Sequence, residues 1–183
     1  MTHEWLQLLN ESLAAENPDR PAVMTLATLS RNGSPRARSV ICRAIDDDGT
    51  IWITSDARSR KNGQIKTDRR IEAVFWLPTR RLQFRIRGEA RLVSAPHRRA
   101  VELWKSLSDS TRAMFTWPVP GESCTEPDDA FPATLSSDAP PPESFWAIAI
   151  HPRLVDALDL HDHPHRRRRW RRKYEWRAER INP

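Results

Sequence analysis

Several features that would mark a class of protein are absent from this sequence or scarce in it. Only two cysteines occur in 183 residues, Cys42 and Cys124, and they stand at no metal-ligand spacing. A disulfide framework is therefore disfavoured and a reducing compartment is expected. No apolar run approaches the ~20 residues that a membrane-spanning helix needs. The sequence has no G-x-G-x-x-G and no Walker loop, which excludes the common dinucleotide and P-loop phosphate sites.

Positive charge is in excess. The chain has 30 Lys and Arg against 24 Asp and Glu, for a formal net charge of +6. Such a balance favours anionic partners, including nucleic acid and phosphorylated small molecules, without choosing among them. The segment Met1–Glu16 contains several Glu and no signal-peptide pattern, so we expect a cytoplasmic protein without a membrane partner.

The apolar pattern has the two-residue period of strands over most of the chain. Trp5, Leu8, Leu9 and Leu13 predict an amphipathic helix over residues 3–16, and a second helix is predicted over 96–107 with Ser94 as its cap. Residues 117–144 are rich in proline and predict a long surface loop. Strands are predicted over 23–29, 36–44, 50–54, 71–77, 81–94, 145–150 and 154–160, followed by a hairpin of 166–174 and 176–181.

The turns between these strands are short. Asn32-Gly33 predicts a hairpin turn after the first strand, and Gly88 marks a bulge in the longest one. Because the strands follow one another with few helices between them, the predicted fold class is mainly β, an antiparallel barrel rather than alternating β-α-β units. We expect residues 1–183 to form a single domain.

The segment Thr54–Lys61 (TSDARSRK) follows a predicted strand and opens a predicted short helix. Ser59, Arg60 and Lys61 place a hydroxyl, a guanidinium and an ammonium within one turn, where backbone N–H groups add a positive field. An Arg can bind two phosphate oxygens at once and a Lys supplies a compact charge. The segment therefore suits a phosphate monoester, with a solvated basic loop as the alternative.

Two further segments could meet a flat ring. On the strand Arg38–Arg43 (RSVICR), two arginines flank an apolar centre, and a ring could lie along the strand edge. Gln83 can both donate and accept a hydrogen bond, so it can meet an imide edge. Taken singly, each is equally typical of a half-exposed strand.

Four segments, in this order, carry a family resemblance. RSVICR is similar to a strand motif Arg-x-Val-x-x-Lys, and TSDARSRK to a phosphate motif Thr-Asn-x-x-Ser-Arg-Lys with one extra residue. LQFRIRGEARLVS is similar to a long Gln-bearing strand, and the terminal WRAERINP to a closing Trp-x-x-x-Arg-Leu-x-Pro. Over roughly residues 20–183 the chain thereby resembles the pyridoxamine 5'-phosphate oxidase-like FMN-binding family. The resemblance implies an antiparallel split β-barrel that binds FMN.

The resemblance also implies which residues contact the cofactor. Arg60 and Lys61 would hold the phosphate of FMN with help from Ser59 and Thr54, and Gln83 would face the flavin ring. Arg43 stands where the family has a Lys; an Arg cannot be neutralised, so no proton transfer is expected of it. No catalytic residue is assigned. The implied FMN contacts are Arg38, Val40, Arg43, Thr54, Ser59, Arg60, Lys61, Gln83 and Arg169.

The substrate residues of the family match less well. Its Tyr, Arg and Ser on the helix after the long strand fall at Trp104, Ser108 and Arg112, so an Arg is present but displaced by one helical turn. The family's late Arg-x-His motif falls near residues 165–167, where this chain has the sequence HRR. The substrate candidates are therefore Arg43, Trp104, Arg112 and Arg167. These departures identify the chain as a member of a divergent branch, in which flavin binding is better supported than vitamin B6 oxidation.

The resemblance implies an FMN-dependent oxidoreductase acting on a small anionic substrate, with pyridoxamine or pyridoxine 5'-phosphate as the candidate. It also implies a homodimer with FMN at the interface. A flavin-binding module or flavin reductase without vitamin B6 oxidase activity is the alternative.

A third hypothesis, a basic barrel that binds nucleic acid, depends on the run Arg166–Lys173 (RRRRWRRK). Because this run continues into a strand-like segment, we interpret it as folded, which disfavours a nucleic-acid partner. His161, His163 and His165 alternate around Pro164 and are interpreted as a polar turn, so no metal is expected.

Overall fold

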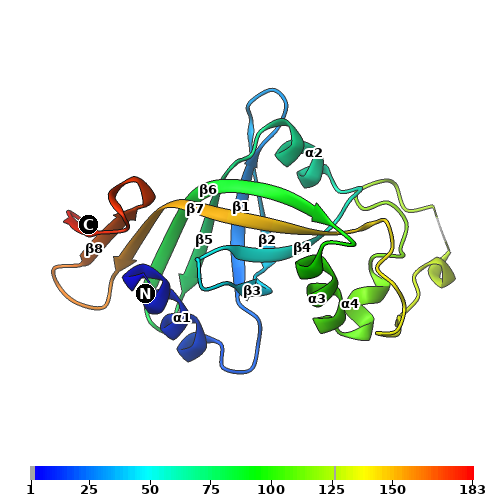
Figure 1. Cartoon of the computed structure of the whole chain (residues 1–183), viewed down its shortest axis with the longest axis horizontal. Coiled ribbons are helices and arrows are strands. Elements are labelled where there is room, and N and C mark those ends of the chain that lie inside the picture. The colour runs from blue at the N-terminus through cyan, green and yellow to red at the C-terminus, as the bar shows by residue number, and fades with distance from the viewer. Residues whose placement is uncertain (1–2, 126) are drawn as a thin grey trace.

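The computed structural model describes residues 3–125 and 127–183. Its strands form one antiparallel sheet that curls into a half-barrel (Figure 1). This confirms the predicted fold class, a mainly β antiparallel split barrel. The strands are β1 (Val23–Leu29), β2 (Pro35–Ile41), β3 (Ala44–Ile45), β4 (Ile51–Asp56), β5 (Arg70–Leu77), β6 (Leu82–Ser94), β7 (Phe145–Asp159), β8 (Arg166–Arg171) and β9 (Ala178–Ile181).

The strand order along the sheet is β2-β1-β5-β6-β7-β4-β3, with β8 and β9 added beside the second half of β7. The helices are α1 (Glu4–Glu16), α2 (Arg60–Thr67), α3 (Arg98–Ser106) and α4 (Asp109–Ala113), and two 3-10 turns span Asp128–Ala130 and Arg172–Tyr174. In the described part of the chain, no helix has the length and apolarity to cross a membrane. Figure 1 shows α3, α4 and the long loop gathered at one end of the curled sheet and the β8 hairpin at the other.

The core fills the inside of the curl. On β6 the inward Leu82, Phe84 and Ile86 are buried, and the residues between them face outward, as the two-residue period predicts. Helix α1 covers the core with Trp5, Leu6, Leu9 and Ser12 rather than with the predicted stripe, in which Leu8 and Leu13 are only partly buried. The ring of Trp5 lies directly against Gly49, where a Cβ would be 2.6 Å from it, and this contact sets the rotation of the helix.

The predicted strand 36–44 is interrupted, because its backbone changes partner. The N–H of Cys42 donates to the carbonyl of Ala22 and extends the pairing of β2 with β1, at 2.8 Å. The N–H of the next residue, Arg43, donates to the carbonyl of Trp52 on β4, also at 2.8 Å. The segment Cys42–Arg43 therefore joins the two edges of the sheet, and the strands β2 and β4 diverge beyond it. This divergence is the split in the barrel.

Two other boundaries differ from the sequence prediction. The strands predicted over 145–150 and 154–160 are one strand, β7, because the pairing with β6 continues across a bulge: Arg87 pairs with Leu154 and Gly88 with Pro152, so Arg153 of β7 is the extra residue. A Cβ at Gly88 would lie 2.2 Å from the carbonyl oxygen of His151, so the predicted bulge glycine is confirmed by a close backbone approach.

Helix α3 begins later than predicted. Its cap is His97, whose side chain accepts from the N–H of Arg99, because Ser94 still pairs with Trp146 as the last residue of β6. The short helix α4, which was not predicted, is capped by Ser108, whose Oγ accepts from the N–H of Thr111. The loop over 117–144 contains only a single 3-10 turn among its described residues, as predicted.

Candidate functional site

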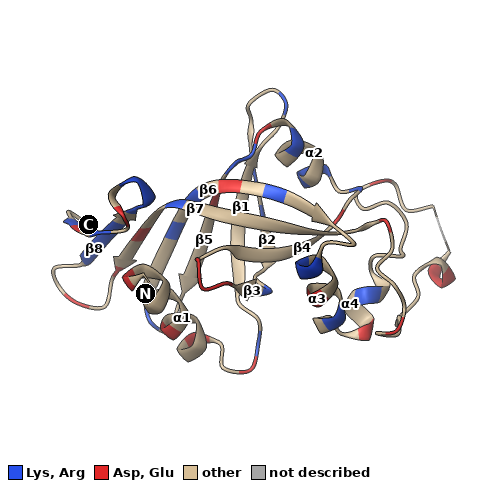
Figure 2. Ribbon diagram, viewed as in Figure 1, with Lys and Arg blue, Asp and Glu red and all other residues tan. Residues whose placement is uncertain are grey.

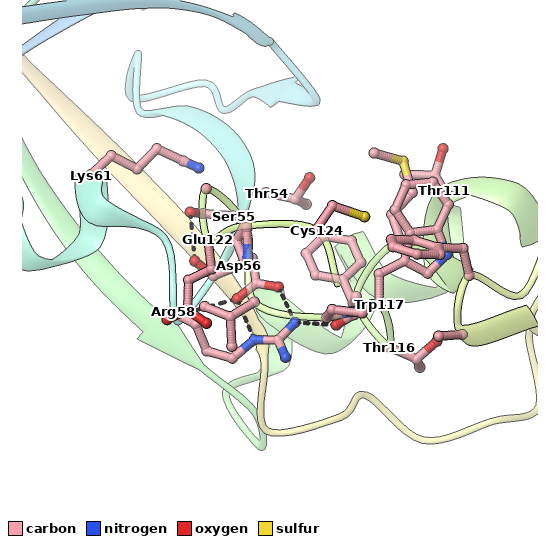
Figure 3. Close-up of a pocket in the computed structure, with 18 of the residues that line it drawn as sticks. Thr54, Ser55, Asp56, Arg58, Lys61, Thr111, Thr116, Trp117, Glu122 and Cys124 are labelled. Carbon is pink, nitrogen blue, oxygen red and sulfur yellow. Dashed lines mark hydrogen bonds and ion pairs between the residues drawn. The ribbon is translucent and has the colours of Figure 1, made fainter. Parts of the chain in front are cut away.

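A cleft of about 1110 Å³ opens where β2 and β4 diverge (Figure 3). This volume is slightly above the roughly 300–1,000 Å³ usual for ligand pockets. Two walls enclose it, and each has a distinct composition. The strand wall consists of Ser39, Val40, Ile41, Arg43, Thr54, Ser55, Asp56, Arg58 and Lys61, and the loop wall consists of Thr111, residues 114–125, Ala130 and Phe131.

The start of α2 is fixed against the end of β4 by a buried amide. Asn62 is fully buried, its side-chain N–H donates to the carbonyl of Asp56 at 2.9 Å, and it accepts from Ser55 Oγ at 2.8 Å. The turn is closed by the N–H of Arg58, which donates to the Asp56 carboxylate at 2.8 Å. These bonds hold the first turn of α2 beside the cleft, with Ser59 at the N-cap. Asn62 was missed in the sequence, where it reads as an ordinary polar helix residue.

Lys61 extends from this turn into the cleft without a carboxylate partner. Its Nζ donates to Ser59 Oγ at 3.1 Å, and among the described residues it makes no ion pair. Burial, and then the nearby charge of Arg38, lower the pKa of Lys61. The nearby carboxylate of Asp56 is paired with Arg58, so a half-buried ammonium beside a guanidinium is an electrostatic site for a bound anion.

Arg38 supports the same site from β2. Its guanidinium donates to the carbonyl of Leu26 at 3.1 Å, to Thr28 Oγ1 at 2.7 Å and to Gln64 Oε1 at 2.9 Å. All three acceptors are neutral, so the charge is positioned but not neutralised. Burial lowers the pKa of Arg38. The fixed position and the unpaired charge suit a second cation for the same anion.

Arg43 carries an unsatisfied donor. Its Nε is buried and has no hydrogen-bond partner, and burial lowers its pKa. The residue stands between β2 and β3, where the backbone pairing changes from β1 to β4, and it lines the cleft. A buried polar group without a partner costs free energy, and a ligand with an acceptor at this point would satisfy it.

The structure thus gathers most of the predicted cofactor residues at the strand wall. Val40, Arg43, Thr54 and Lys61 line the cleft, and Ser59 and Arg38 lie beside Lys61. Arg60 differs: it is the first residue of α2, it is exposed, and it is not among the residues that line the cleft.

Gln83 and Arg169 lie elsewhere in the chain. Thr54 pairs with Ala147 on β7, whereas Gln83 pairs with Leu158, eleven residues further along the same strand. At about 3.3 Å per residue this is roughly 35 Å along β7. Arg169 is at the same distant end, where it bonds Asp156 together with Arg167, at 3.1 and 2.7 Å. Figure 2 shows this separation as basic residues on α2 and, apart from them, on β8.

These distant residues share one outward surface, which we call the sheet face. Gln83 is flanked on β6 by the buried Leu82 and Phe84, so its side chain points out of the barrel. The pairing places Gln83 in one cross-strand row with Trp76 and Arg167. The sheet face consists of Trp76, Gln83, Arg85, Arg167 and Arg169.

Two predicted substrate residues, Trp104 on α3 and Arg112 on α4, are buried. Trp104 is 1% exposed, and its Nε1 donates to the carbonyl of Ala139 at 2.8 Å. Arg112 is 2% exposed; it donates to the carbonyls of Leu135 and Leu107 and forms an ion pair with Asp109. Both side chains attach the long loop to the helices, and neither presents a free polar group to the cleft. The hydrophobic period of the sequence does not indicate that a Pro-rich loop covers this helical face.

Arg58 connects the two walls. Like Asn62, it was not predicted from the sequence as a residue of the site. Its Nη2 lies 2.6 Å from Asp56 Oδ2 and donates to the carbonyl of Trp117 at 2.8 Å, as the dashed lines of Figure 3 show. The pKa of Arg58 is raised by its hydrogen bond to Asp56. This arginine therefore positions the loop wall and is not free to bind an anion. Its place inside the TSDARSRK motif was the only signal in the sequence.

Comparisons with known proteins agree with this geometry. Residues 2–94 match the family model described as "Pyridoxamine 5'-phosphate oxidase, FMN-binding domain". Pyridoxine/pyridoxamine 5'-phosphate oxidase 2 of Arabidopsis thaliana is 27% identical over 164 residues, which cover 85% of this chain and 83% of that protein. A pyridoxine/pyridoxamine 5'-phosphate oxidase of Thermosynechococcus vestitus is 37% identical over 87 residues, or 48% of this chain and 40% of that protein.

Solved structures extend the likeness to the whole chain. A pyridoxamine 5'-phosphate oxidase-related, FMN binding protein from Nostoc punctiforme superposes with a TM-score of 0.91 at 28% identity, covering 100% of both chains. PhzG from Burkholderia lata, in complex with tetrahydrophenazine-1-carboxylic acid, superposes with a TM-score of 0.84 at 20% identity, covering 99% of this chain and 93% of that one. The second likeness is one of fold.

Proposed function

The chain belongs to the pyridoxamine 5'-phosphate oxidase FMN-binding domain family, and on this premise we propose that it binds FMN in the cleft and uses it as an oxidoreductase. One observation carries the proposal. Among the described residues Lys61 and Arg38 are neighbouring cations without an ion pair, and Arg43, whose buried Nε has no described partner, lines the same cleft. A phosphate at one end and a polar ring edge at the other would satisfy all three groups.

Lys61, Thr54 and Arg43 of the strand wall and the neighbouring Arg38 and Ser59 have tasks in this proposal. Lys61 and Arg38 hold the phosphate, with Ser59, Thr54 and the N–H groups at the start of α2. Arg60 would have to turn toward the phosphate to contribute. Arg43 donates to the polar rim of the ring and keeps its charge throughout, so it orients and does not move a proton. FMN itself supplies the capacity to accept and return a hydride equivalent.

We infer a homodimer from the distance between the two groups of predicted cofactor residues. Gln83 and Arg169 lie roughly 35 Å along β7 from the strand wall, so they can contact the same FMN only as residues of a second copy. The exposed Trp76, 47% accessible, gives the sheet face an apolar contact for such a copy. Light scattering on the purified protein tests this: twice the chain mass supports the dimer, and a monomer that still holds FMN rejects it.

The binding site is tested by comparing FMN with riboflavin, which has the same ring and no phosphate. We expect the wild-type protein to bind FMN far more tightly than riboflavin, and Lys61→Ala to lose much of that preference, since a charge-assisted contact contributes about 1.5–3 kcal/mol. Quenching of flavin fluorescence measures both affinities. Equal affinity for the two flavins in the wild type would reject this phosphate site.

Two activities remain as candidates for the FMN-loaded protein. One is oxidation of pyridoxamine or pyridoxine 5'-phosphate, an anionic substrate. The other is flavin binding or flavin reduction without that activity, which the burial of Trp104 and Arg112 favours. Incubation with pyridoxamine 5'-phosphate in air, with detection of pyridoxal 5'-phosphate and peroxide, separates them: product supports the first, and no product at high enzyme concentration supports the second.

A further inference from the structure

We propose that the loop wall binds a flat aromatic substrate that carries no phosphate group. The inference rests on the proposed function, because it assigns the strand wall to FMN and asks what the other wall of the same cleft can hold. Three observations support it: the charges on the loop wall, its apolar side chains and the way in which its aromatic residue is held.

The loop wall has no cation with which to hold a phosphate. Of the described residues that form it, none is Lys, Arg or His, and the one charged side chain is the acidic Glu122. A phosphate dianion placed against this wall would lose its hydration and meet a carboxylate instead of a positive charge.

The cations nearest to the loop wall are already engaged. Arg112 is buried with its guanidinium bonded to Leu135, Leu107 and Asp109. Arg58 is paired with Asp56 at 2.6 Å. Lys61 and Arg43, on the strand wall, are the groups assigned to FMN. The described residues of the cleft therefore leave no cation for a second phosphate.

Apolar side chains instead face the cleft from both sides. Five large apolar residues are notably exposed in the described chain, and two of them line this cleft: Met114 on the loop wall, 51% exposed, and Ile41 on the strand wall, 40% exposed. Exposed apolar surface inside a cleft indicates a site that an apolar ligand covers. Trp117 and Phe131 extend this surface along the loop wall.

Trp117 is held in one orientation. Its Nε1 donates to the carbonyl of Pro132 at 2.9 Å, and its ring packs edge-to-face on Phe131 with centroids 5.6 Å apart. Its carbonyl accepts from Arg58 (Figure 3). The indole therefore has no free donor, and it offers a fixed aromatic surface. Such a surface favours a flat ring, which must also lie flat on the flavin in order to exchange a hydride equivalent.

The loop wall has four hydroxyl groups, those of Thr111, Thr116, Ser123 and Thr125; Thr111 also contacts Ser108 Oγ, and Thr116 donates to the carbonyl of Ala113. They can bond uncharged ring substituents such as a hydroxyl or a carbonyl. The wall thus combines apolar contact with a few neutral polar groups, which is the composition of a site for an uncharged organic molecule.

A matched pair of probes tests the inference on the FMN-loaded protein: 2-naphthol and 2-naphthyl phosphate, which share one fused ring. Titration is followed by the change in the flavin absorption spectrum. We expect 2-naphthol to bind roughly tenfold or more tightly than 2-naphthyl phosphate and than pyridoxamine 5'-phosphate. Equal or tighter binding of either phosphate, or no binding of 2-naphthol at millimolar concentration, would overturn the inference.

Three variants in the cleft and one control outside it locate the site. Trp117→Ala should weaken 2-naphthol binding roughly tenfold with FMN retained, and Trp117→Phe should restore most of it. Met114→Arg, at an exposed position, should raise the affinity for 2-naphthyl phosphate by roughly tenfold, because it adds the missing cation. Tyr174→Ala removes an exposed aromatic outside the cleft and should change neither affinity. Unchanged affinities in both Trp117→Ala and Met114→Arg would overturn the proposed site.

The failure of this inference can be distinguished from the failure of the proposed function. If the protein takes up no FMN, the proposed function and this inference are both rejected. If it binds FMN in preference to riboflavin but prefers 2-naphthyl phosphate to 2-naphthol, the cofactor assignment stands and the substrate class is wrong.

Discussion

The strand wall and the loop wall face the same cleft but are built in opposite ways. The strand wall belongs to regular elements, and its cations Lys61 and Arg43 have no anionic partner among the described residues. The loop wall is largely irregular. The nearby Arg112 is buried, and its guanidinium donates to the carbonyl of Leu135 in the long loop. An arginine near a cleft is therefore not by itself a ligand-binding residue. What matters is whether the chain already satisfies its guanidinium.

The largest expected effect is on the strand wall. The double change Arg38→Ala and Lys61→Ala removes both unpaired cations, and we expect FMN affinity to fall by about 3–6 kcal/mol, from about 1.5–3 kcal/mol for each charge-assisted contact. Isothermal titration calorimetry measures it. Arg60→Ala is the matched control: its side chain is exposed outside the cleft, so its effect should be much smaller. An Arg60 effect as large as the double change would contradict this assignment.

Beside the loop wall, a change at the buried Arg112 should affect stability instead of cofactor binding. Arg112→Met leaves the buried carbonyls of Leu135 and Leu107 without a donor, and we expect a loss of about 2–4 kcal/mol in the free energy of unfolding. Denaturant unfolding measures this. Arg98→Met is the control, since that side chain is 90% exposed and should change stability by less than about 0.5 kcal/mol. Lost FMN affinity with unchanged stability would remove the contrast between the walls.

A smaller effect is expected where the walls join. Arg58→Gln breaks the ion pair with Asp56 and weakens the hold on the carbonyl of Trp117. We expect 2-naphthol affinity to fall by roughly threefold to tenfold, because the loop wall loses a partly exposed anchor that contributes about 1 kcal/mol. FMN affinity, measured on the same samples, should change by less than about twofold. A larger loss for FMN than for 2-naphthol would show that Arg58 serves the strand wall.

The smallest effect is a pH dependence. Burial and Arg38 lower the pKa of Lys61 in the free protein, and a bound phosphate would favour the charged form and raise it again. FMN binding then takes up a proton, so affinity should fall as pH rises through the lowered pKa of Lys61 and be independent of this group below it. Fluorescence titrations from neutral to alkaline pH measure the slope. Lys61→Met should remove it, and a slope that persists in this variant would contradict the assignment.

The strand wall could be predicted because local chemistry determines it. A hairpin turn at Asn32-Gly33, a strand period and a basic turn at Ser59–Lys61 are each visible within a few residues of sequence. The hydrophobic alternation likewise predicted β1, β5 and β6 closely. The break between Cys42 and Arg43 was not predicted, because it depends on two different partner strands.

The loop wall could not be predicted, because packing between distant segments determines it. The family resemblance implied Trp104 and Arg112 as substrate residues. Their actual partners, Ala139 and Leu135, lie across a Pro-rich loop with no period of its own. The positions of Gln83 and Arg169 could not be predicted for the same reason. The sequence suggests the type of contact that each side chain makes, but it does not indicate that both lie far from the cleft of the same chain.

The central claim is that the cleft between the two walls holds FMN by its phosphate, and a crystal structure of the protein grown with FMN tests it most directly. We predict the phosphate within hydrogen-bond distance of Lys61 Nζ and the Arg38 guanidinium, with the ring extending toward Arg43 Nε. A flavin bound elsewhere, with Lys61 and Arg43 still unpaired, would contradict the account.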